Sequence, residues 1–334
     1  MVNTNCLTLG KMPPKIYTYD KLSDLKDFEI SDTVIGEGSF GRVREALRRA
    51  KGKNPEMKVA IKEIKSGCLQ TSHDQANFHR ELCVQISLKH LCILPIVGYT
   101  VPFMGQGKYS IITPLMAKGS LKHVIKDLSR GIAPDGWDDT KRSIIIFGIA
   151  CGMAYIHQSD VIHRDLKCDN VLLDENFYPK ICDFGLSKVF KEGTENMIKM
   201  TRNTGTPLYM APEIYDNEAY SNKVDVFAFA MLLFEFLTLD EPWKERGKPT
   251  LFKLVAYLTQ GLRPNLAGVS DSFKELIERC WDQDPHARPP FKEIVELLIT
   301  KRKEFFDDPS IDEEELLDFM ETAITNLKLD VKLE

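Results

Sequence analysis

His163-Arg164-Asp165-Leu166-Lys167-Cys168-Asp169-Asn170 is the stretch that decides how the rest of the chain is interpreted. It places a potential base (Asp165), a cation (Lys167) and an amide that can bind a metal (Asn170) in one short segment. Asp, Asn and Lys are also ordinary loop residues, so this composition fits a solvated loop as well as a reactive one. The spacing to the next polar cluster separates the two interpretations.

The second cluster is Asp183-Phe184-Gly185, which lies beyond the apolar run Val171-Leu172-Leu173. We expect two short strands between the clusters, and these would bring Asp183 back beside Asn170. A carboxylate and an amide oxygen suit Mg²⁺, because this hard cation keeps waters and substrate phosphates as its other ligands. The spacing therefore predicts a magnesium site close to Asp165.

The two clusters together resemble a known family pattern. His-Arg-Asp-Leu-x-x-x-Asn followed by Asp-Phe-Gly is similar to the catalytic loop and metal-binding segment of eukaryotic protein kinases, and the resemblance covers about residues 28–300. It implies an α+β, bilobal protein kinase fold. We expect a small, mainly antiparallel β N-lobe with helix C over about residues 28–116 and a large, mainly α-helical C-lobe over about 117–300. Residues 1–27 would form an extension, and residues 301–334 an acidic amphipathic tail.

The glycine-rich segment Gly36-Glu37-Gly38-Ser39-Phe40-Gly41-Arg42-Val43 tests this resemblance. The same G-x-G-x-x-G spacing occurs in dinucleotide-binding folds, where the third glycine opens a helix. Here a turn at residues 51–55 and the run Val59-Ala60-Ile61-Lys62 follow instead, which predicts a β-hairpin. The glycines then resemble the flexible lid that kinases fold over nucleotide phosphates. A dehydrogenase ranks far last, because it requires a helix after Gly41.

Lys62 is the expected anchor for the ATP phosphates. A lone strand lysine usually points into solvent, so this assignment depends on a charged partner. We expect an amphipathic helix that begins at Phe78, and its Glu81 would pair with Lys62 as helix-C glutamates do in kinases. Gln85 departs from the family pattern, which usually has Leu or Met there. Either Gln85 finds a hydrogen bond or the helix docks less firmly.

Further strands are expected at Ile93–Gly98 and Tyr109–Thr113. The run from Tyr109 to Met116 resembles the fifth kinase strand and the hinge that binds adenine. Thr113 would be the gatekeeper, and Met116 would offer its backbone N–H to the ring. The resemblance implies ATP and Mg²⁺, or Mn²⁺ in its place, as cofactors. The residues that it assigns to the nucleotide and its metal are Ile35, Gly36, Gly38, Gly41, Val43, Ala60, Lys62, Glu81, Thr113, Pro114, Met116, Asn170, Leu172 and Asp183.

The resemblance also implies separate roles for the residues of the catalytic loop. Asp165 would accept or orient the proton of the substrate hydroxyl, and Lys167 would stabilise the charge on the transferred γ-phosphoryl group. His163 is expected to pack beneath the loop. Lys167 together with the block Gly205-Thr206-Pro207-Leu208-Tyr209-Met210-Ala211-Pro212-Glu213 resembles serine/threonine kinases. The residues near Phe229–Glu235 and the Cys280-Trp281 block resemble the tyrosine-kinase-like branch of these kinases. The expected partner is therefore a protein substrate with a Ser or Thr.

The strongest alternative is a pseudokinase, a scaffold that binds nucleotide or partners without transferring phosphate. Such scaffolds often lose parts of the catalytic set. The chain retains all of it: Lys62, Glu81, Asp165, Asn170 and Asp183. Gln85 is the one residue that keeps this alternative open.

Residues 183–213 resemble a kinase activation segment. Thr201 and Thr204 are the candidates for phosphorylation, with Thr201 preferred. Arg164 would pair with the added phosphate, because new arginine–phosphate contacts can order such a segment.

Three further features are expected to support the catalytic loop or the helical lobe. Residues 137–157 read as a buried helix with Asp138 or Asp139 near its cap. The apolar run around Asp225 resembles the central buried kinase helix whose aspartate holds the backbone of the catalytic loop, and a buried carboxylate without such donors would be costly. By resemblance, Arg288 pairs with Glu213.

The C-terminal tail carries a helix signal. Ser310 and Glu313 have the spacing of a capping box. Leu316, Met320, Ala323 and Leu327 follow at i+4, i+3 and i+4, so they share one face. We expect this helix to pack on the C-lobe. The alternative is that it docks a partner.

The bulk composition limits the remaining choices. At 334 residues with 43% hydrophobic and 28% charged residues, the chain reads as a soluble globular protein. Its net charge of −5 argues against a nucleic-acid binder. No apolar run reaches the ~20 residues of a membrane span, and no signal peptide is visible. The 8 cysteines lack paired metal-ligand spacing, which favours reduced thiols and a cytoplasmic location, with the nucleus as the alternative.

Overall fold

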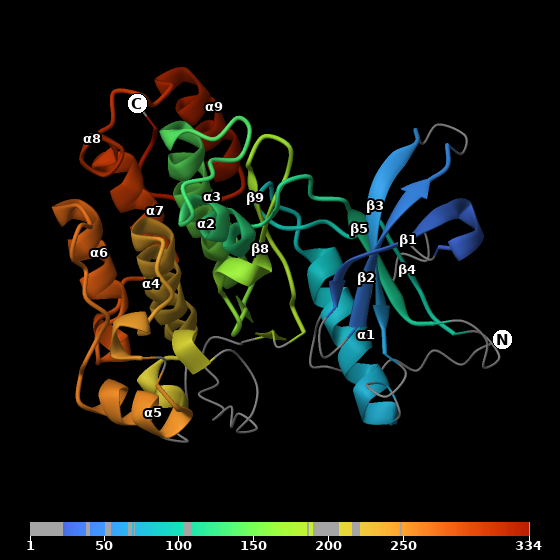
Figure 1. Ribbon diagram of the computed structural model, residues 1–334, viewed down its shortest axis with the longest axis horizontal. Helices are drawn as coiled ribbons and strands as arrows, with labels where there is room; N and C mark the ends of the chain where they lie inside the picture. Colours follow the sequence, from blue (N-terminus) through green and yellow to red (C-terminus); the bar gives the residue numbers. More distant parts are fainter. Residues whose placement is uncertain are drawn as a thin grey trace. The chain divides into compact units, whose positions relative to one another are not determined.

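The computed structural model describes residues 23–37, 41–50, 55–65, 69, 71–102, 108–185, 187–189, 207–215, 221–247 and 249–333. The chain forms two compact units. The first unit comprises Met1–Ser87 and Pro95–Leu115, and the second comprises Leu88–Leu94 and Met116–Glu334. Figure 1 identifies the elements of both units by label and colour.

The first unit is built on an antiparallel sheet with the strand order β1-β2-β3-β5-β4. Its strands are β1 (Phe28–Glu37), β2 (Gly41–Arg48), β3 (Met57–Ile64), β4 (Gly98–Thr100) and β5 (Ser110–Pro114). The expected hairpin after the glycines is confirmed, because β2 and β3 pair continuously from Gly41–Ile64 to Arg48–Met57. One face of the sheet buries Val59, Ile61 and Ile112.

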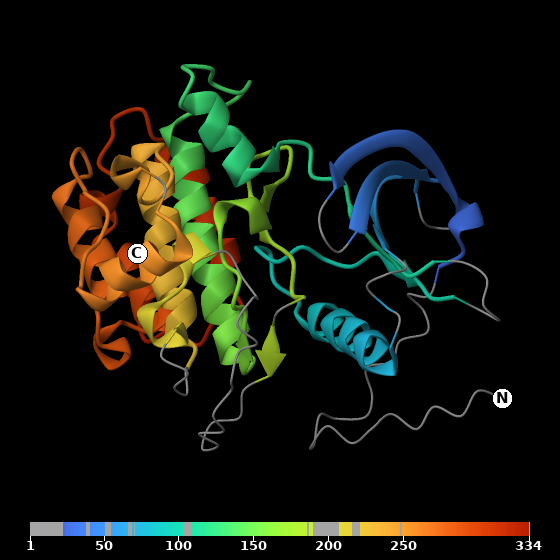
Figure 2. The same cartoon turned by 60° about the horizontal axis from the view of Figure 1, so that its bottom comes forward.

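Helix α1 (Ser72–Ser87) covers the opposite face of this sheet, as Figure 2 shows. Neighbouring residues of a strand point to opposite faces. Ile111 therefore packs with Phe78 and Leu82 of α1, whereas the adjacent Ile112 belongs to the other cluster. Gln85 is buried on this helix.

The start of α1 differs from the prediction. The helix begins at Ser72, six residues before Phe78, and its first backbone bond runs from Gln75 N to Thr71 O at 3.1 Å. The extra turns are polar, so apolar periodicity gives no signal for them.

The strand expected at Ile93–Gly98 is also wrong in its bounds, since β4 is Gly98–Thr100. Leu94 N instead donates to Ile181 O at 2.9 Å, and Ile93 forms a parallel bridge with Ile181. Pro95 has no N–H to continue a ladder. The segment before Pro95 therefore belongs to the second unit.

The second unit is mainly helical. Its helices are α2 (Leu121–Leu128), α3 (Asp139–Gln158), α4 (Lys223–Thr238), α5 (Leu251–Thr259), α6 (Asp271–Cys280), α7 (Phe291–Thr300), α8 (Arg302–Phe305) and α9 (Glu313–Ile324). Short 3₁₀ turns in the two units span Leu25–Asp27, Cys168–Asn170, Pro207–Tyr209, Pro212–Ile214, Lys244–Arg246 and Pro285–Ala287. The expected combination of a β-rich unit and a helical unit is confirmed.

Helix α3 is the core of this unit, and its cap is as predicted, although the helix begins at Asp139 and not at Trp137. The Asp138 side chain accepts a hydrogen bond from Lys141 N at 2.8 Å and so caps the helix. Its apolar residues are buried on every side, and helices α7 and α9 pack against it. Two small sheets lie beside it. One joins β6 (Gly119–Ser120), β8 (Val171–Leu173) and β9 (Pro179–Ile181), and the other joins β7 (Val161–Ile162) and β10 (Lys188–Val189).

The C-terminal helix α9 packs on α3, so its expected docking on the helical unit is confirmed (Figure 1). Leu316, Met320 and Ala323 are buried as predicted, but the helix ends before Leu327. The capping box is wrong, because Asp312 caps the helix by accepting from Glu315 N at 3.0 Å. The Ser310 hydroxyl lies instead within hydrogen-bond distance of Asp308 Oδ1, at 2.7 Å, and of Asp139 Oδ2, at 3.0 Å.

None of the helices in the described part of the chain has the length and apolarity that a membrane crossing needs.

Replacing Gly41 with Ala tests the close strand pairing. A Cβ there would lie 2.4 Å from the backbone oxygen of Glu63, whereas at Gly36 the nearest atom would be 3.8 Å away. We expect Gly41→Ala to destabilise the first unit by about 1–3 kcal/mol. Gly36→Ala should leave its stability nearly unchanged. Thermal melting of the nucleotide-free proteins measures both, and equal shifts would contradict this packing.

Candidate active site

The catalytic loop brings Asp165, Lys167 and Asn170 together as the sequence predicts. Lys167 Nζ donates to Asp165 Oδ2 at 2.7 Å. The Asn170 amide nitrogen donates to the same oxygen at 2.9 Å and to the Asp165 backbone oxygen at 2.8 Å. The three side chains thus form one hydrogen-bonded group in which a lysine and an amide orient a carboxylate.

The amide of Asn170 fits a metal ligand. Both of its N–H donors are directed at Asp165, so its carbonyl oxygen faces the other way. Asn170 is buried and forms part of a 3₁₀ turn, which restricts its side chain. An amide oxygen held in this way is a suitable ligand for a hard cation such as Mg²⁺.

The strands β8 and β9 return the chain to Asn170. They pair antiparallel from Val171–Ile181 to Leu173–Pro179. Directly beyond β9, Cys182 N donates to Asn170 O at 2.9 Å. Asp183 is the next residue and adopts a left-handed conformation with φ of 65°. The prediction that two short strands bring Asp183 back beside Asn170 is therefore confirmed at the level of the backbone.

His163 is a structural residue of this loop, as expected. It is fully buried, and its ring packs edge-on against Phe184 with centroids 5.1 Å apart. Its Nδ1 accepts from Asp165 N at 3.3 Å, so Nε2 carries the proton and donates to Cys182 O at 3.1 Å. His163 therefore links the backbone of the catalytic loop to the segment that carries Asp183.

Asp225 of α4 holds the catalytic loop from below. Its carboxylate accepts from His163 N at 2.8 Å and from Arg164 N at 2.7 Å, and it also contacts His157 Nε2 at 2.9 Å. Burial favours a raised pKa, but the His157 contact, the nearby His163 and the Arg164 N–H together hold the pKa of Asp225 below its usual range. Arg164 has φ of 71°, so these bonds fix a strained backbone.

In the first unit, the predicted nucleotide residues lie at defined sheet positions. Lys62 stands between Val43 of β2 and Ile111 of β5, and Ala60 pairs with Thr113. The remaining members are placed as follows: Ile35 and Gly36 on β1, Gly41 on β2 and Pro114 on β5. The structure therefore places these residues on one continuous sheet.

The predicted nucleotide residues of the second unit lie on two segments. Leu172 is the middle residue of β8 and pairs with both Lys180 and Ser120. Met116 opens the segment before β6, and its carbonyl accepts from Gly119 N at 3.2 Å.

Several predicted residues fall outside the described part of the chain. These are Gly38, Thr201 and Thr204. Glu81 lies in α1, but its side chain is not among those described, so its pairing with Lys62 stays a prediction.

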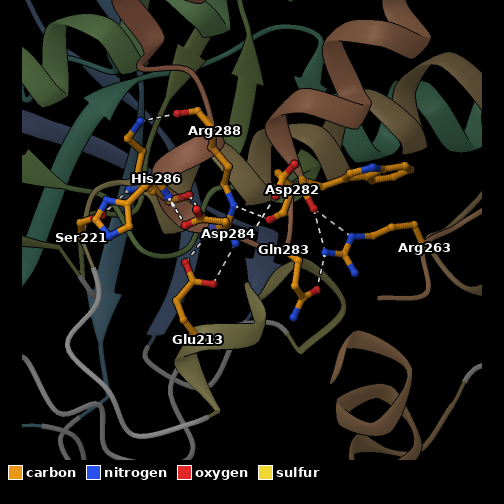
Figure 3. Close-up of polar contacts among 10 residues, drawn as sticks. Glu213, Ser221, Arg263, Asp282, Gln283, Asp284, His286 and Arg288 are labelled. Carbon is orange, nitrogen blue, oxygen red and sulfur yellow. Dashed lines mark hydrogen bonds and ion pairs between the residues drawn. The ribbon is translucent and has the colours of Figure 1, made fainter. Parts of the chain in front are cut away.

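Arg288 and Glu213 form the ion pair that the resemblance implies (Figure 3). The guanidinium donates to both carboxylate oxygens, at 2.6 and 2.9 Å, and also to Asp282 O at 2.9 Å. Arg288 is buried and lies over the ring of Phe227. The end of the activation segment is thereby fixed to the helical core.

A second buried carboxylate, Glu235 of α4, was not assigned a partner from the sequence. It binds Lys122 of α2 and the hydroxyl of Tyr209. Burial raises the pKa of Glu235, although Lys122 opposes this. Cys168 is buried beside α4, with its thiol directed at Leu232 O. The signal was present in the sequence, since a carboxylate within an apolar run requires a buried partner.

Comparison with known proteins agrees with this geometry. The sequence profile described as protein tyrosine and serine/threonine kinase matches residues 30–298. The chain therefore belongs to the protein tyrosine and serine/threonine kinase family. Within the family it resembles kinases of the tyrosine-kinase-like type.

Three relatives illustrate the similarity. The dual specificity protein kinase shkB of Dictyostelium discoideum is 35% identical over 80% of this chain and 39% of its own length. The probable serine/threonine-protein kinase drkC of the same organism is 35% identical over 84% of this chain and 36% of its own length. The serine/threonine-protein kinase VIK of Arabidopsis thaliana is 34% identical over 79% of this chain and 58% of its own length. The chain thus spans less than two thirds of the length of each of these relatives.

Truncating Arg288 to Ala should cost about 3–5 kcal/mol of unfolding free energy, because Glu213 would be left as an uncompensated, poorly solvated charge. Arg279 offers a matched control, since its pair with Glu293 is exposed. Arg279→Ala should change stability by no more than about 1 kcal/mol. Urea denaturation of both variants measures the difference, and similar losses would contradict the burial argument.

Asp225→Asn should destabilise the chain by about 1–3 kcal/mol, because the amide group would face backbone donors. The pKa of Asp225 in the folded state lies below its unfolded value of about 3.9. Its contribution is therefore complete above about pH 4 and is lost as pH falls through the folded value. The stability gap between wild type and variant should narrow below pH 4 in denaturation series. The exposed Asp169→Asn is the control, and a gap independent of pH would contradict the assignment.

Proposed function

We propose that this chain is a serine/threonine protein kinase that transfers the γ-phosphate of ATP to Ser or Thr hydroxyls of protein substrates. The observation that carries the proposal is the group of Asp165, Lys167 and Asn170. It offers a carboxylate, a cation and a metal-binding amide within hydrogen-bond distance of one another. Phosphoryl transfer needs this combination, because positioning and charge stabilisation provide most of its catalysis.

Each residue has a defined task in this proposal. Asp165 accepts or orients the proton of the substrate hydroxyl, and its hydrogen bonds to Lys167 and Asn170 hold the carboxylate in one orientation. Lys167 stabilises the negative charge that develops on the transferred group. Asn170 and Asp183 would hold Mg²⁺, or Mn²⁺ in its place. When bound, the metal neutralises charge on the phosphates.

The nucleotide is assigned to residues of the sheet and of the segment that follows it. Lys62 anchors the phosphates, with Glu81 as its proposed partner. Gly36, Gly38 and Gly41 cover the phosphates, and the backbone around Met116 holds the adenine ring. The register that aligns Ala60 with Thr113 and Lys62 with Ile111 supports a shared adenine and phosphate surface.

Two observations support Ser and Thr as the substrate class. Lys167 stands two residues after Asp165, a spacing that resembles serine/threonine kinases. Several relatives are named serine/threonine-protein kinases. Others, such as shkB, are named dual specificity kinases, which makes additional phosphorylation of tyrosine the second candidate activity.

Regulation and surroundings follow from the same assignment. We assign Thr201 and Thr204 as phosphorylation sites that Arg164 would bind, because the backbone of Arg164 is fixed by Asp225. The apolar face of α9 packs on α3, so a partner of this helix would contact its exposed acidic face. Cys92, Cys151, Cys168 and Cys280 are buried free thiols, which supports a reducing location such as the cytoplasm or the nucleus.

Asp165→Asn should abolish phosphorylation of a generic basic protein by the purified chain with Mg-ATP. The expected loss is at least about 100-fold, because the acceptor of the hydroxyl proton is removed. Asp169→Asn is the matched control, since this exposed carboxylate lies in the same loop. It should keep most of the activity. Undiminished labelling by Asp165→Asn would overturn the proposed function.

Phosphoamino-acid analysis of the wild-type product tests the substrate class. Phosphoserine and phosphothreonine alone are expected. Phosphotyrosine beside them would support dual specificity, and phosphotyrosine alone would contradict the Ser/Thr assignment.

A further inference from the structure

Helix α3 has a notch formed by two glycines one turn apart. A Cβ on Gly148 would lie 2.5 Å from Pro179 Cγ and 2.9 Å from Phe319 Cζ. A Cβ on Gly152 would lie 2.7 Å from Ile181 Cδ1. Real Cβ atoms do not approach other atoms this closely, so glycine is required for the present packing. The notch therefore receives β9 from one side and α9 from the other.

Phe319 of α9 contacts the residue that precedes β9 and meets the same glycine as the first residue of β9. Its ring lies 4.7 Å from that of Tyr178, and it shares the Gly148 notch with Pro179. Phe319 is fully buried. A residue of the C-terminal helix thus forms part of the wall against which the β8–β9 hairpin rests.

Polar contacts fix α9 in this position at both ends. At its start, Asp312 N donates to Thr140 Oγ1 at 2.9 Å, and Lys141 pairs with Glu315. At its end, Ala323 O accepts from His90 Nε2 at 2.8 Å. The helix is therefore held at its start by α3 and at its end by the segment Leu88–Leu94.

The hairpin that Phe319 supports carries the two proposed metal ligands. Asn170 directly precedes β8, and Asp183 follows β9 after Cys182. Each strand has only three residues, and so short a hairpin has little stability of its own. Its position depends on what it packs against. β8 pairs with β6, and Ile181 of β9 exchanges backbone hydrogen bonds with Cys92 and Leu94. At the Pro179 end the hairpin lies against the notch of α3, beside Phe319.

We propose that Phe319 is a positioning residue for the metal site, acting through Pro179 and Tyr178 on the backbone that places Asp183 beside Asn170. The proposal rests on the proposed kinase function for its chemical meaning. The C-terminal helix then contributes to the metal site of the catalytic unit, and it influences the affinity of the chain for its metal. Supports of metal ligands commonly act in this way, since they orient the ligands.

The first experiment compares Phe319→Ala with Phe305→Ala by hydrogen exchange of the full chain. Phe305 is the matched control, because it is also a buried aromatic residue near the C-terminus but packs on Phe273 and Phe306. Phe319→Ala should speed exchange of the Ile181 and Cys182 amides several-fold, and Phe305→Ala should leave them unchanged. Equal exchange at these two amides in both variants would overturn the proposal.

The second experiment measures the Mg²⁺ concentration that gives half-maximal phosphorylation at saturating ATP. Phe319→Ala should raise it by roughly tenfold, as expected for loss of a support behind a metal ligand. Phe305→Ala should leave this Mg²⁺ concentration unchanged, even if it lowers the melting temperature as much as Phe319→Ala does. An unchanged Mg²⁺ dependence in Phe319→Ala would reduce Phe319 to a stability residue and overturn the proposal.

Two further variants keep the test decisive. Phe319→Leu retains most of the side chain, so it should restore the Mg²⁺ dependence, and it replaces Phe319→Ala if that variant does not fold. Gly148→Ala fills the notch from the other side and should speed exchange at the same amides. A wild type that shows no phosphotransfer would refute the proposed function, whereas the exchange comparison would still decide the role of Phe319.

Discussion

The buried carboxylate of Asp225 is the constraint on which the rest of the helical unit depends. An isolated carboxylate inside a protein is costly unless donors surround it. Here the donors are backbone N–H groups of His163 and Arg164 and the ring of His157. The loop and α4 therefore specify each other. The left-handed backbone conformation of Arg164, the residue before Asp165, is stabilised by the hydrogen bond from Arg164 N to the Asp225 carboxylate.

The same dependence extends from the loop to its neighbours. His163 passes the constraint to the segment before Asp183 through its bond to Cys182 O. At the end of the β8–β9 hairpin, the hydrogen bond from Cys182 N to Asn170 O joins this segment back to the catalytic loop. Because these strands are short, the hydrogen-bonded segments depend on the packing of α3, α4 and α9 around them. The loops that carry the proposed chemistry are thus supported by three helices packed around them.

The sequence predicted those features of the fold and of the site in which one motif determines one contact. The Asp138 cap, the β2–β3 hairpin, the role of Asp225 and the Arg288–Glu213 pair each follow from local spacing or from the family pattern. The errors arise where tertiary contacts override local signals. Ser310 has the spacing of a cap, but its hydroxyl faces Asp308 and Asp139, and Asp312 caps the helix. The partners of Glu235 come from α2 and from Tyr209, and no local pattern connects these segments.

The buried polar groups serve to specify one position of the chain more than to increase the free energy of unfolding. Exchanging a buried ion pair for apolar residues is often neutral in free energy, whereas removing one partner is costly. Glu213 with Arg288, and Glu235 with Lys122 and Tyr209, each join the end of the activation segment to the helical core. Two such nodes flank Met210, Ala211 and Pro212, so this stretch has few alternative positions. An apolar core would tolerate sliding of the stretch, but paired charges do not. The arrangement keeps a fixed border between the activation segment and the catalytic loop that it adjoins.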